Sequence, residues 1–181
     1  MKIIRSLFVI LCFSVFGIGS IILNFLLFPF IKENKELCSD IIHKSWRFFT
    51  NLFVVLGLIK LDIKRLNKIE NKVIVCTHPS FIDIVILIGL IPRTTCFAKK
   101  ELAHNPILKN LVNSIFITNE VELDELKAQS KKMLDRGFNV IIFPSGIRHR
   151  KNEYPKIKKG ASLIALNANK NIVPIRIFDD T

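Results

Sequence analysis

The chain has 181 residues, of which 50% are hydrophobic and 23% charged, and its formal net charge at pH 7 is +12. This length allows one domain with a substantial core and excludes two domains of ordinary size. The apolar content excludes a disordered or low-complexity protein. The mean hydropathy of +0.37 is unusual for a soluble nucleic-acid-binding protein of this charge. A protein that lies on an anionic membrane surface combines both properties.

The N-terminal segment from Ser6 to Ile31 contains no charged residue. As a helix it would be about 39 Å long, which exceeds the ~30 Å hydrocarbon core of a bilayer. Lys2 and Arg5 resemble the basic start of a signal peptide, but the apolar run of a signal peptide ends after about 7–15 residues. The sequence therefore favours a retained membrane helix. Asn24 and Pro29 leave room for a kink, or for a helix that enters one leaflet and returns.

A second apolar stretch, from Trp46 to Ile59, is rich in aromatic residues and has basic flanks. It predicts either a core helix or an interfacial helix, and the aromatic and basic side chains slightly favour the interface. More basic residues follow the first helix than precede it, so the positive-inside tendency puts the C-terminal domain in the cytoplasm. The predicted location is a membrane, a bacterial inner membrane in this interpretation.

From residue 71 onward, short β-branched runs alternate with amphipathic stretches. Strands are predicted at residues 72–78, 94–98, 114–118, 139–143 and 172–178. Helices are predicted at 82–90, between Asn119 as N-cap (with Glu122 at N3) and Gly137 as stop signal, and near 161–169. This alternation predicts an α/β fold, a largely parallel sheet with flanking helices, preceded by an N-terminal membrane helix or helix pair. We divide the chain into a membrane-anchoring helical segment, residues 1–70, and an α/β domain, residues 71–181.

The first candidate site follows the first predicted strand. Pro79 cannot continue a strand, so the chain turns directly after His78. Asp83 then lies about one turn into the next helix, where its carboxylate can accept a hydrogen bond from one imidazole nitrogen and leave the other as a general base. The alternative is a structural histidine, with Asp83 as a negative charge at a helix N-terminus. Spacing alone favours that alternative.

The second candidate site is the segment from Phe143 to Arg148, which opens a basic loop after a predicted strand. Gly146 permits close backbone approach, and Arg148 can hold a phosphate or carboxylate through two parallel hydrogen bonds. A solvated loop that only touches lipid headgroups is the alternative, and it is favoured for Lys151 and Lys156. Because ligand sites gather at strand ends in parallel sheets, a binding role is favoured for Arg148.

The remaining cysteines and histidines predict no further site. The four cysteines are scattered, which argues against a disulfide framework or a zinc site and favours a reducing compartment. Three histidines lack a partner at catalytic spacing and are interpreted as surface or interface residues: His43, His104 and His149.

Five segments together resemble, in order and spacing, the four sequence blocks of the glycerolipid acyltransferases, the enzymes related to lysophosphatidic acid acyltransferase. They are HPSFID (78–83), FAKKEL (97–102), FITN (116–119), FPSGIR (143–148) and VPIRI (173–177). The resemblance covers about residues 45–181. It implies a membrane enzyme that transfers a fatty acyl chain from acyl-CoA or acyl-carrier protein to a lysolipid hydroxyl, with 1-acylglycerol-3-phosphate as the first choice of acceptor. The implied partners are membrane lipids and the acyl donor, which is a co-substrate. No cofactor, metal or nucleic acid is implied.

The resemblance also assigns roles to single residues. His78 would deprotonate the attacking hydroxyl, and Asp83 would hold the imidazole and stabilise its charged form; these two are the candidate catalytic residues. Arg148 matches the arginine of the third block and would hold the phosphate of the acceptor. Lys99 and Gly146 match a lysine and a glycine of the family's blocks and are further candidates for substrate binding.

The chain departs from the family's pattern in the acceptor blocks. Ser145 replaces a glutamate that is thought to help hold the glycerol part of the acceptor; we keep it among the candidate substrate-binding residues. Ile147 replaces a threonine, and Asn119 replaces an arginine at the end of the second block. Relatives in specialised lipid pathways, such as aryl-polyene synthesis, also lack that arginine, so a non-standard acceptor is one alternative. A non-catalytic lipid-binding relative is another. Many members continue beyond the fourth block, so with the sequence ending at Thr181 a short C-terminal cap is expected to be missing.

Overall fold

The centre of the molecule is a single five-stranded sheet. The computed structural model describes residues 2–27, 29, 34–63, 68–77, 80, 82–106, 108–118, 122–146 and 156–177. The strands are β1 (Val73–Cys76), β2 (Thr94–Ala98), β3 (Ile117–Thr118), β4 (Asn139–Ile142) and β5 (Ile172–Ile175), in the spatial order β3-β2-β4-β1-β5. Every pairing between neighbouring strands is parallel. The predicted parallel α/β fold is therefore confirmed.

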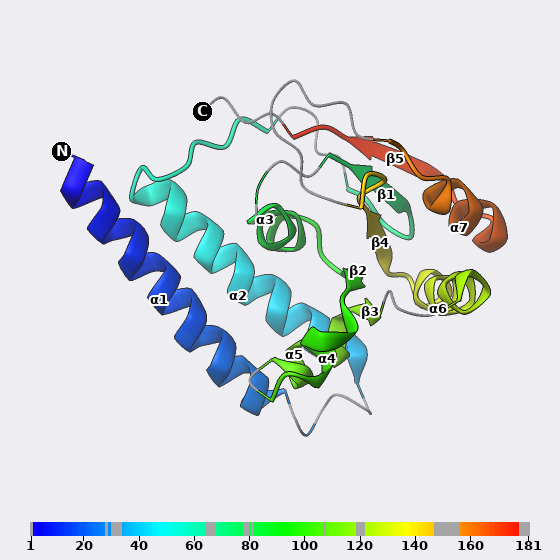
Figure 1. Ribbon diagram of the computed structural model, residues 1–181, viewed down its shortest axis with the longest axis horizontal. Coiled ribbons are helices and arrows are strands. Elements are labelled where there is room, and N and C mark those ends of the chain that lie inside the picture. Colours follow the sequence, from blue (N-terminus) through cyan, green and yellow to red (C-terminus); the bar gives the residue numbers. More distant parts are fainter. Residues whose placement is uncertain are drawn as a thin grey trace.

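Helices cover both faces of the sheet (Figure 1). On one side lie α1 (Lys2–Leu26), α2 (Lys35–Val55) and α3 (Asp83–Leu90), and on the other lie α6 (Leu123–Asp135) and α7 (Gly160–Ala168). Side chains alternate between these layers, as a strand period of two requires. Val73 and Val140 pack toward α6 and α7, whereas Ile74 and Ile141 pack toward α3. The flanking helices of the prediction are confirmed.

Helix α2 begins well before the predicted apolar stretch. The side chain of Asn34 caps it by accepting a hydrogen bond from the Leu37 N–H at 2.9 Å, a typical N-cap interaction. Phe49 and Phe53 are buried, whereas Phe48 is 68% exposed. The helix therefore has a core face, and it also presents aromatic surface on its outer side.

Helix α2 lies directly on α3. A Cβ added to Gly89 in α3 would come within 2.9 Å of the Arg47 backbone nitrogen and 3.0 Å of the Trp46 carbonyl atoms. Only glycine allows two backbones to approach so closely. The Nδ1 atom of His43 lies 2.7 Å from the carbonyl oxygen of Ile88 in the last turn of α3. His43 is therefore an interface residue, as predicted, and α2 fixes the helix that begins with Asp83.

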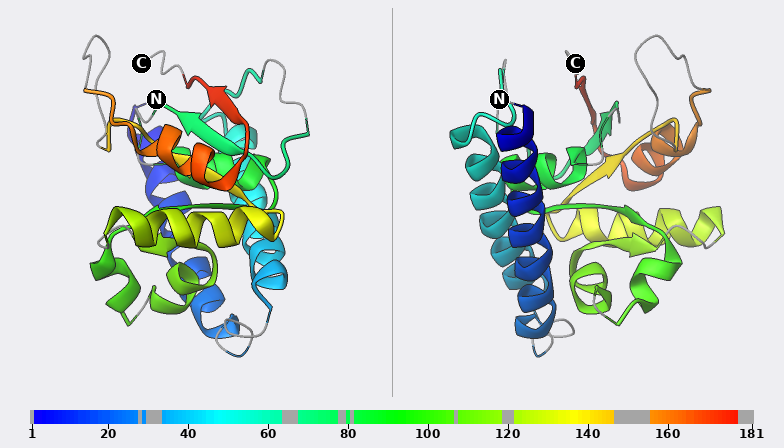
Figure 2. Two further views of the ribbon diagram at one scale, coloured as in Figure 1. Left: turned by 90° about the vertical axis from the view of Figure 1, so that its right-hand side faces the viewer. Right: turned by 60° about the vertical axis from the view of Figure 1, so that its left-hand side comes forward.

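Helix α1 runs beside α2 in the opposite direction (Figures 1 and 2). The segment Ser6–Leu26 is the only described helix long and apolar enough to cross a membrane, a test that a core helix or a signal sequence also passes. Asn24, near its end, is 1% exposed. Its Oδ1 atom accepts hydrogen bonds from the N–H groups of Asn110 (2.8 Å) and Leu111 (3.3 Å). These amides open helix α5 (Lys109–Ile115), so Asn24 caps a helix far away in sequence.

Two sequence predictions between β2 and α6 are wrong. The predicted strand 114–118 is shortened to β3, because Ser114 and Ile115 complete α5. Asn119 is not the N-cap of α6, because the extended residue Glu122 occupies that position without a side-chain cap bond; Asn119 itself lies outside the described residues. The predicted stop is confirmed, since Gly137 follows the last turn with φ 85°, a conformation that favours glycine. A short helix, α4 (Lys100–His104), precedes α5.

Candidate active site

The carboxylate of Asp83 closes the turn between β1 and α3. Asp83 is the first residue of α3 and is 2% exposed. Its Oδ2 atom accepts a hydrogen bond from the backbone N–H of Ser80 at 2.8 Å. A buried carboxylate needs such donors, because desolvation of the charge is costly. Asp83 therefore has a structural role in the turn. The catalytic role predicted with His78 stays a prediction, since His78 and Pro79 lie outside the described residues.

The end of β1 is held in place next to this turn. The hydroxyl of Thr77 donates to the Ile177 carbonyl at 3.2 Å and accepts from the Ile177 N–H at 2.8 Å. Through this side chain, the residue after β1 is attached to the segment that follows β5. Burial, with the negative charge of Asp83, raises the pKa of the Cys76 thiol to about 12. The Asp83 carboxylate therefore raises the pKa of the last residue of β1, which lies two positions before His78 in the sequence. Cys76 stays a neutral thiol.

Candidate binding residues lie at the ends of two neighbouring strands. Lys99 follows β2 directly and is exposed, with an extended backbone at the start of α4. After β4 the chain turns, and the Gly146 N–H donates to the Phe143 carbonyl at 2.9 Å. Gly146 has φ 69°, where any other residue would be strained. Ser145 is half-buried in the same turn.

Lys158 also lies at this turn. A Cβ on Gly146 would be 3.2 Å from the Lys158 Nζ atom, and the Lys158 backbone N–H donates to the Pro144 carbonyl at 2.9 Å. The sequence showed this lysine only as one charge of the basic loop. The structure identifies it as a cation beside the candidate site. Arg148, predicted for that position, lies outside the described residues.

An apolar volume of about 580 Å³ runs from these strand ends to α1 and α2, which we call the helix pair; we call this volume the apolar cavity. Lys99, Phe143 and Gly146 line its sheet end, and Phe16, Ser20 and Trp46 line its far end. Between them, α3 contributes Ile84 and Val85, directly after Asp83. The other lining residues are Phe97, Ala98, Leu102, Leu108, Leu111, Val112, Phe116, Leu126, Ile141 and Ile142. Ligand pockets in proteins have volumes of roughly 300–1,000 Å³, so the cavity can hold a flexible apolar ligand.

The structure brings four of the six predicted site residues to the same edge of the sheet. Lys99 and Gly146 line the cavity, Ser145 precedes Gly146, and Asp83 precedes two lining residues. His78 and Arg148 stay predictions of position. Sequence analysis missed the apolar wall that α5 provides. A signal was present, because Leu108, Leu111, Val112 and Ile115 follow helical spacing. Both histidines of the described chain contact backbone carbonyls, His43 as given above and His104 that of Lys100 at 2.9 Å; His149 lies outside the described residues.

Fold and site define a parallel α/β protein that can receive an apolar ligand at the carboxyl edge of its sheet. A family model described as Acyltransferase matches residues 59–178. The chain therefore belongs to the acyltransferase family, which confirms the resemblance found in the sequence. The division at residue 70 stays a prediction, although α2 packs closely on α3.

Two relatives carry the same enzyme name. The chain is 30% identical over 111 residues to a 1-acyl-sn-glycerol-3-phosphate acyltransferase of Cocos nucifera, covering 56% of this chain and 35% of that protein. It is 31% identical over 140 residues to a protein of the same name from Bacillus subtilis (strain 168), covering 71% of this chain and 69% of the relative. The crystal structure of the 1-acyl-sn-glycerophosphate (LPA) acyltransferase PlsC from Thermotoga maritima matches with a TM-score of 0.68 at 17% identity. That match covers 95% of this chain and 72% of the other, and it shows a shared fold.

Proposed function

We propose that the protein is a membrane-bound O-acyltransferase. It moves a fatty acyl chain from acyl-CoA or acyl-carrier protein to the hydroxyl of a lysolipid, with 1-acylglycerol-3-phosphate as the acceptor. The observation that carries the proposal is the apolar cavity, which starts at the strand ends next to Asp83 and Lys99 and continues to the helix pair. A fatty acyl chain is the ligand that fits an elongated apolar volume with a polar mouth. The names of the relatives support the same chemistry.

The proposed mechanism needs one proton transfer in each direction. His78 takes the proton of the acceptor hydroxyl while its oxygen attacks the thioester carbonyl. The tetrahedral intermediate then collapses, the C–S bond breaks, and the imidazolium returns the proton to the leaving thiolate. Asp83 holds the imidazole and stabilises its charged form. General-base catalysis of this kind contributes about 10²–10⁴-fold.

No acyl-enzyme and no further cofactor form part of the proposal. The thioester is already activated, and its thiolate is a good leaving group. The neighbouring Cys76 is 2% exposed, and its thiol pKa is raised to about 12. A buried protonated thiol is a poor nucleophile, which supports direct transfer between the two substrates.

The charges at the mouth of the cavity suit an anionic lipid. Lys99 follows β2, Lys158 lies beside the turn after the neighbouring β4, and Arg148 is proposed to join them. Arginine and lysine are the side chains that hold phosphate best. In the proposal they bind the phosphate of the acceptor, while the acyl chain of the donor occupies the apolar cavity.

We further propose that α1 lies in one leaflet. The rings of Phe16 and Phe49 are 4.4 Å apart, and Asn24 caps α5, so α1 is docked on the domain over much of its length. If α1 crossed the bilayer upright, Asp40, Lys44 and the sheet beside it would enter hydrocarbon, which is costly. An in-plane helix leaves its apolar side chains in the leaflet. These include Leu7, Ile10, Leu11, Ile18, Ile22 and Phe25. The cytoplasmic side and the bacterial inner membrane stay predictions.

Variants at the two candidate catalytic positions test the proposal. With the full chain in phospholipid vesicles, His78→Ala should lower acyl transfer by about 10²–10⁴-fold without loss of thermal stability. Asp83→Asn keeps an oxygen acceptor for the Ser80 N–H, removes the charge and replaces the other carboxylate oxygen by an NH2 group. It should therefore fold normally and lose activity if Asp83 orients the imidazole. Full transfer by His78→Ala would refute the mechanism, and full transfer by Asp83→Asn would leave Asp83 the structural role alone.

Ser145 supports the alternative acceptor, because it stands where the family's blocks usually have glutamate. The half-buried Ser145 precedes Gly146 at the mouth of the cavity. Ser145→Glu should raise kcat/KM for 1-acylglycerol-3-phosphate relative to other lysolipids by about tenfold, the effect of one added charge-assisted hydrogen bond. Unchanged preference would contradict this role of Ser145, whereas poor use of 1-acylglycerol-3-phosphate by the native chain would favour a non-standard acceptor. Binding of lipids without transfer to any acceptor would favour a lipid-binding relative.

A further inference from the structure

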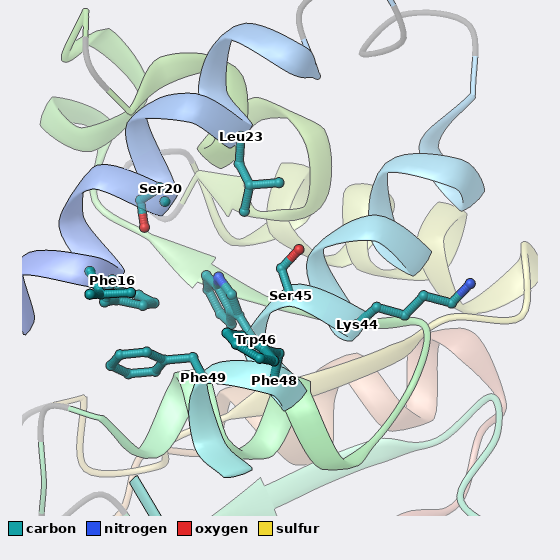
Figure 3. A pocket seen from close by; sticks show the side chains of 10 residues that line it. Phe16, Ser20, Leu23, Lys44, Ser45, Trp46, Phe48 and Phe49 are labelled. Atoms are coloured by element: carbon teal, nitrogen blue, oxygen red, sulfur yellow. The ribbon is translucent and has the colours of Figure 1, made fainter. Parts of the chain in front are cut away.

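A second apolar hollow of about 390 Å³ lies between α1 and α2. We call it the helix-pair groove. Figure 3 shows Phe16, Ser20 and Leu23 of α1 on one side and Trp46 and Phe49 of α2 on the other. Three residues line both this groove and the apolar cavity: Phe16, Ser20 and Trp46. The two hollows therefore share a wall, and that wall is made mainly of aromatic rings.

The central ring of the shared wall belongs to Trp46, and packing alone holds it in place. Trp46 is 5% exposed, and no described residue accepts a hydrogen bond from its indole Nε1. Its ring lies 6.2 Å from the ring of Phe16 and 6.2 Å from that of Phe116. A buried tryptophan usually has a partner for its N–H. Because Trp46 has none in the described chain, turning the ring breaks no hydrogen bond.

Small residues keep the groove open. Gly19 lines it, and a Cβ added there would meet no atom within 4 Å. Ser20 and Ser45 provide short side chains on the two helices. Ring pairs join α1 and α2 around this gap: Phe16 and Phe49, which line it, are 4.4 Å apart, and Phe13 and Phe53 are 5.7 Å apart.

The groove opens on the apolar outer face of the helix pair. Val15 and Phe48 line it, and they are 43% and 68% exposed. Lys44 also lines it, but Figure 3 shows this side chain extending away from the other labelled residues. The opening is therefore flanked by exposed apolar side chains from both helices.

We propose that the helix-pair groove is the bilayer-facing end of the acyl-chain site. The occupant is the methyl-terminal part of a fatty acyl chain, which starts at the strand ends, passes Trp46 and leaves between α1 and α2 into the leaflet. The two hollows adjoin across the shared wall, and its central ring can turn without breaking a hydrogen bond; this carries the inference, which rests on the proposed function. With the Trp46 ring turned aside, the chain site is open at its far end, and long chains are accepted because their ends reach lipid.

Two glycine variants on α1 make a matched test. Gly19→Leu fills the groove, whereas Gly17→Leu adds the same side chain on the same helix at a position that does not line it; both sites have open space for a Cβ. In vesicles with a series of acyl-CoA donors, Gly19→Leu should lower kcat/KM for the longest chains by about 15-fold relative to the shortest. Denying burial to two methylene groups, each worth about fourfold, has this effect. Gly17→Leu should keep the native profile.

Fluorescence gives a second readout that needs no turnover, because Trp46 is the only tryptophan in the chain. A non-reactive thioether analogue of acyl-CoA with bromine near the methyl end should quench Trp46, and Gly19→Leu should weaken this quenching while Gly17→Leu does not. In the reverse experiment the vesicle lipids carry the bromine and the analogue does not. The lipids should then quench Trp46 less when the analogue is saturating than when it is absent. Lipid quenching that persists at saturation would mean that a bilayer lipid holds the groove and would overturn the proposal.

The two readouts separate failure of the inference from failure of the proposed function. Acyl transfer without quenching by the brominated analogue, or with the same chain-length profile in both glycine variants, would overturn the inference and leave the function standing. Quenching that depends on Gly19, without transfer to any acceptor, would support the chain path and contradict the acyltransferase function.

Discussion

The two N-terminal helices lie side by side but are attached to the domain in different ways. Helix α2 carries charged residues and touches α3 backbone to backbone at Gly89. Helix α1 has no charge between Ser6 and Leu26, leaves most of its large side chains exposed, and is held by ring contacts and by Asn24. Helix α2 is therefore part of the fold that positions Asp83. Helix α1 packs one part of its surface on the domain and leaves the other part exposed.

The largest expected effect is the loss of the close contact between α2 and α3. Gly89→Ala puts a methyl group within 3.0 Å of three backbone atoms of α2, which cannot move independently. Such overpacking should lower the free energy of unfolding by about 3 kcal/mol, as measured by urea unfolding in detergent. Gly17→Ala is the control, since its site is open, and it should stabilise α1 by about 0.5–1 kcal/mol. Equal stability of the two variants would contradict the proposed difference between the helices.

A smaller loss is expected when α1 loses its polar attachment. Asn24→Leu removes the acceptor for the N–H groups of Asn110 and Leu111. Unsatisfied buried donors cost about 1–3 kcal/mol, and a loss of about 2 kcal/mol is expected. Hydrogen exchange should speed up at these two amides while α3 stays protected. The control is Ser14→Ala, whose exposed hydroxyl bonds only within α1. If hydrogen exchange became faster in α3 as well, α1 and α3 would unfold as one unit, which would contradict the expected difference.

The smallest effect concerns the ion pair that ties the start of α2 to the end of α6. The guanidinium of Arg136 makes three hydrogen bonds to Glu36, between 2.7 and 3.0 Å. Hydrogen bonding to Arg136 lowers the pKa of the Glu36 carboxyl below its usual value. Because the folded pKa is lowered, the stabilisation is present above the usual value and is lost as the pH falls through the folded pKa.

The pair is about one-third exposed, so solvent screening limits its contribution to about 0.5–1 kcal/mol. The measurement is the difference in unfolding free energy between the native chain and Glu36→Gln as a function of pH. The difference should be largest near neutral pH and vanish in acid. A difference that does not depend on pH would mean that the ion pair contributes nothing.

The sheet could be predicted because its signals are local. Buried parallel strands appear as short β-branched runs, so 94–98 and the starts of 139–143 and 172–178 agree with β2, β4 and β5. The strand predicted at 114–118 failed because Ile115 satisfies two patterns at once. It belongs to a β-branched run and to the helical series from Leu108, and the helix prevailed because Leu111 and Ile115 are buried in the core that α1, α2 and α3 share.

The candidate site could be predicted only in part, for a physical reason. Its polar residues follow strands, and a turn residue such as Gly146 marks the strand end in the sequence. The apolar wall and the attachment of α1 are tertiary. In the sequence Asn24 indicated only a possible kink, because its partner Asn110 lies 86 positions away. Similarly, Lys158 could not be told from its neighbours in the basic loop until the turn at Gly146 was known.

The distance in sequence between Asn24 and α5 has a consequence for how the protein is made. At a translation rate of 5–20 residues per second, the 86 residues between the two asparagines take roughly 4 to 17 s to synthesise. During that interval the hydrophobic helix α1 has been synthesised, while the amides that Asn24 will cap do not yet exist. We therefore expect α1 to bind a lipid surface or a chaperone first and to dock on the domain after the domain has been completed.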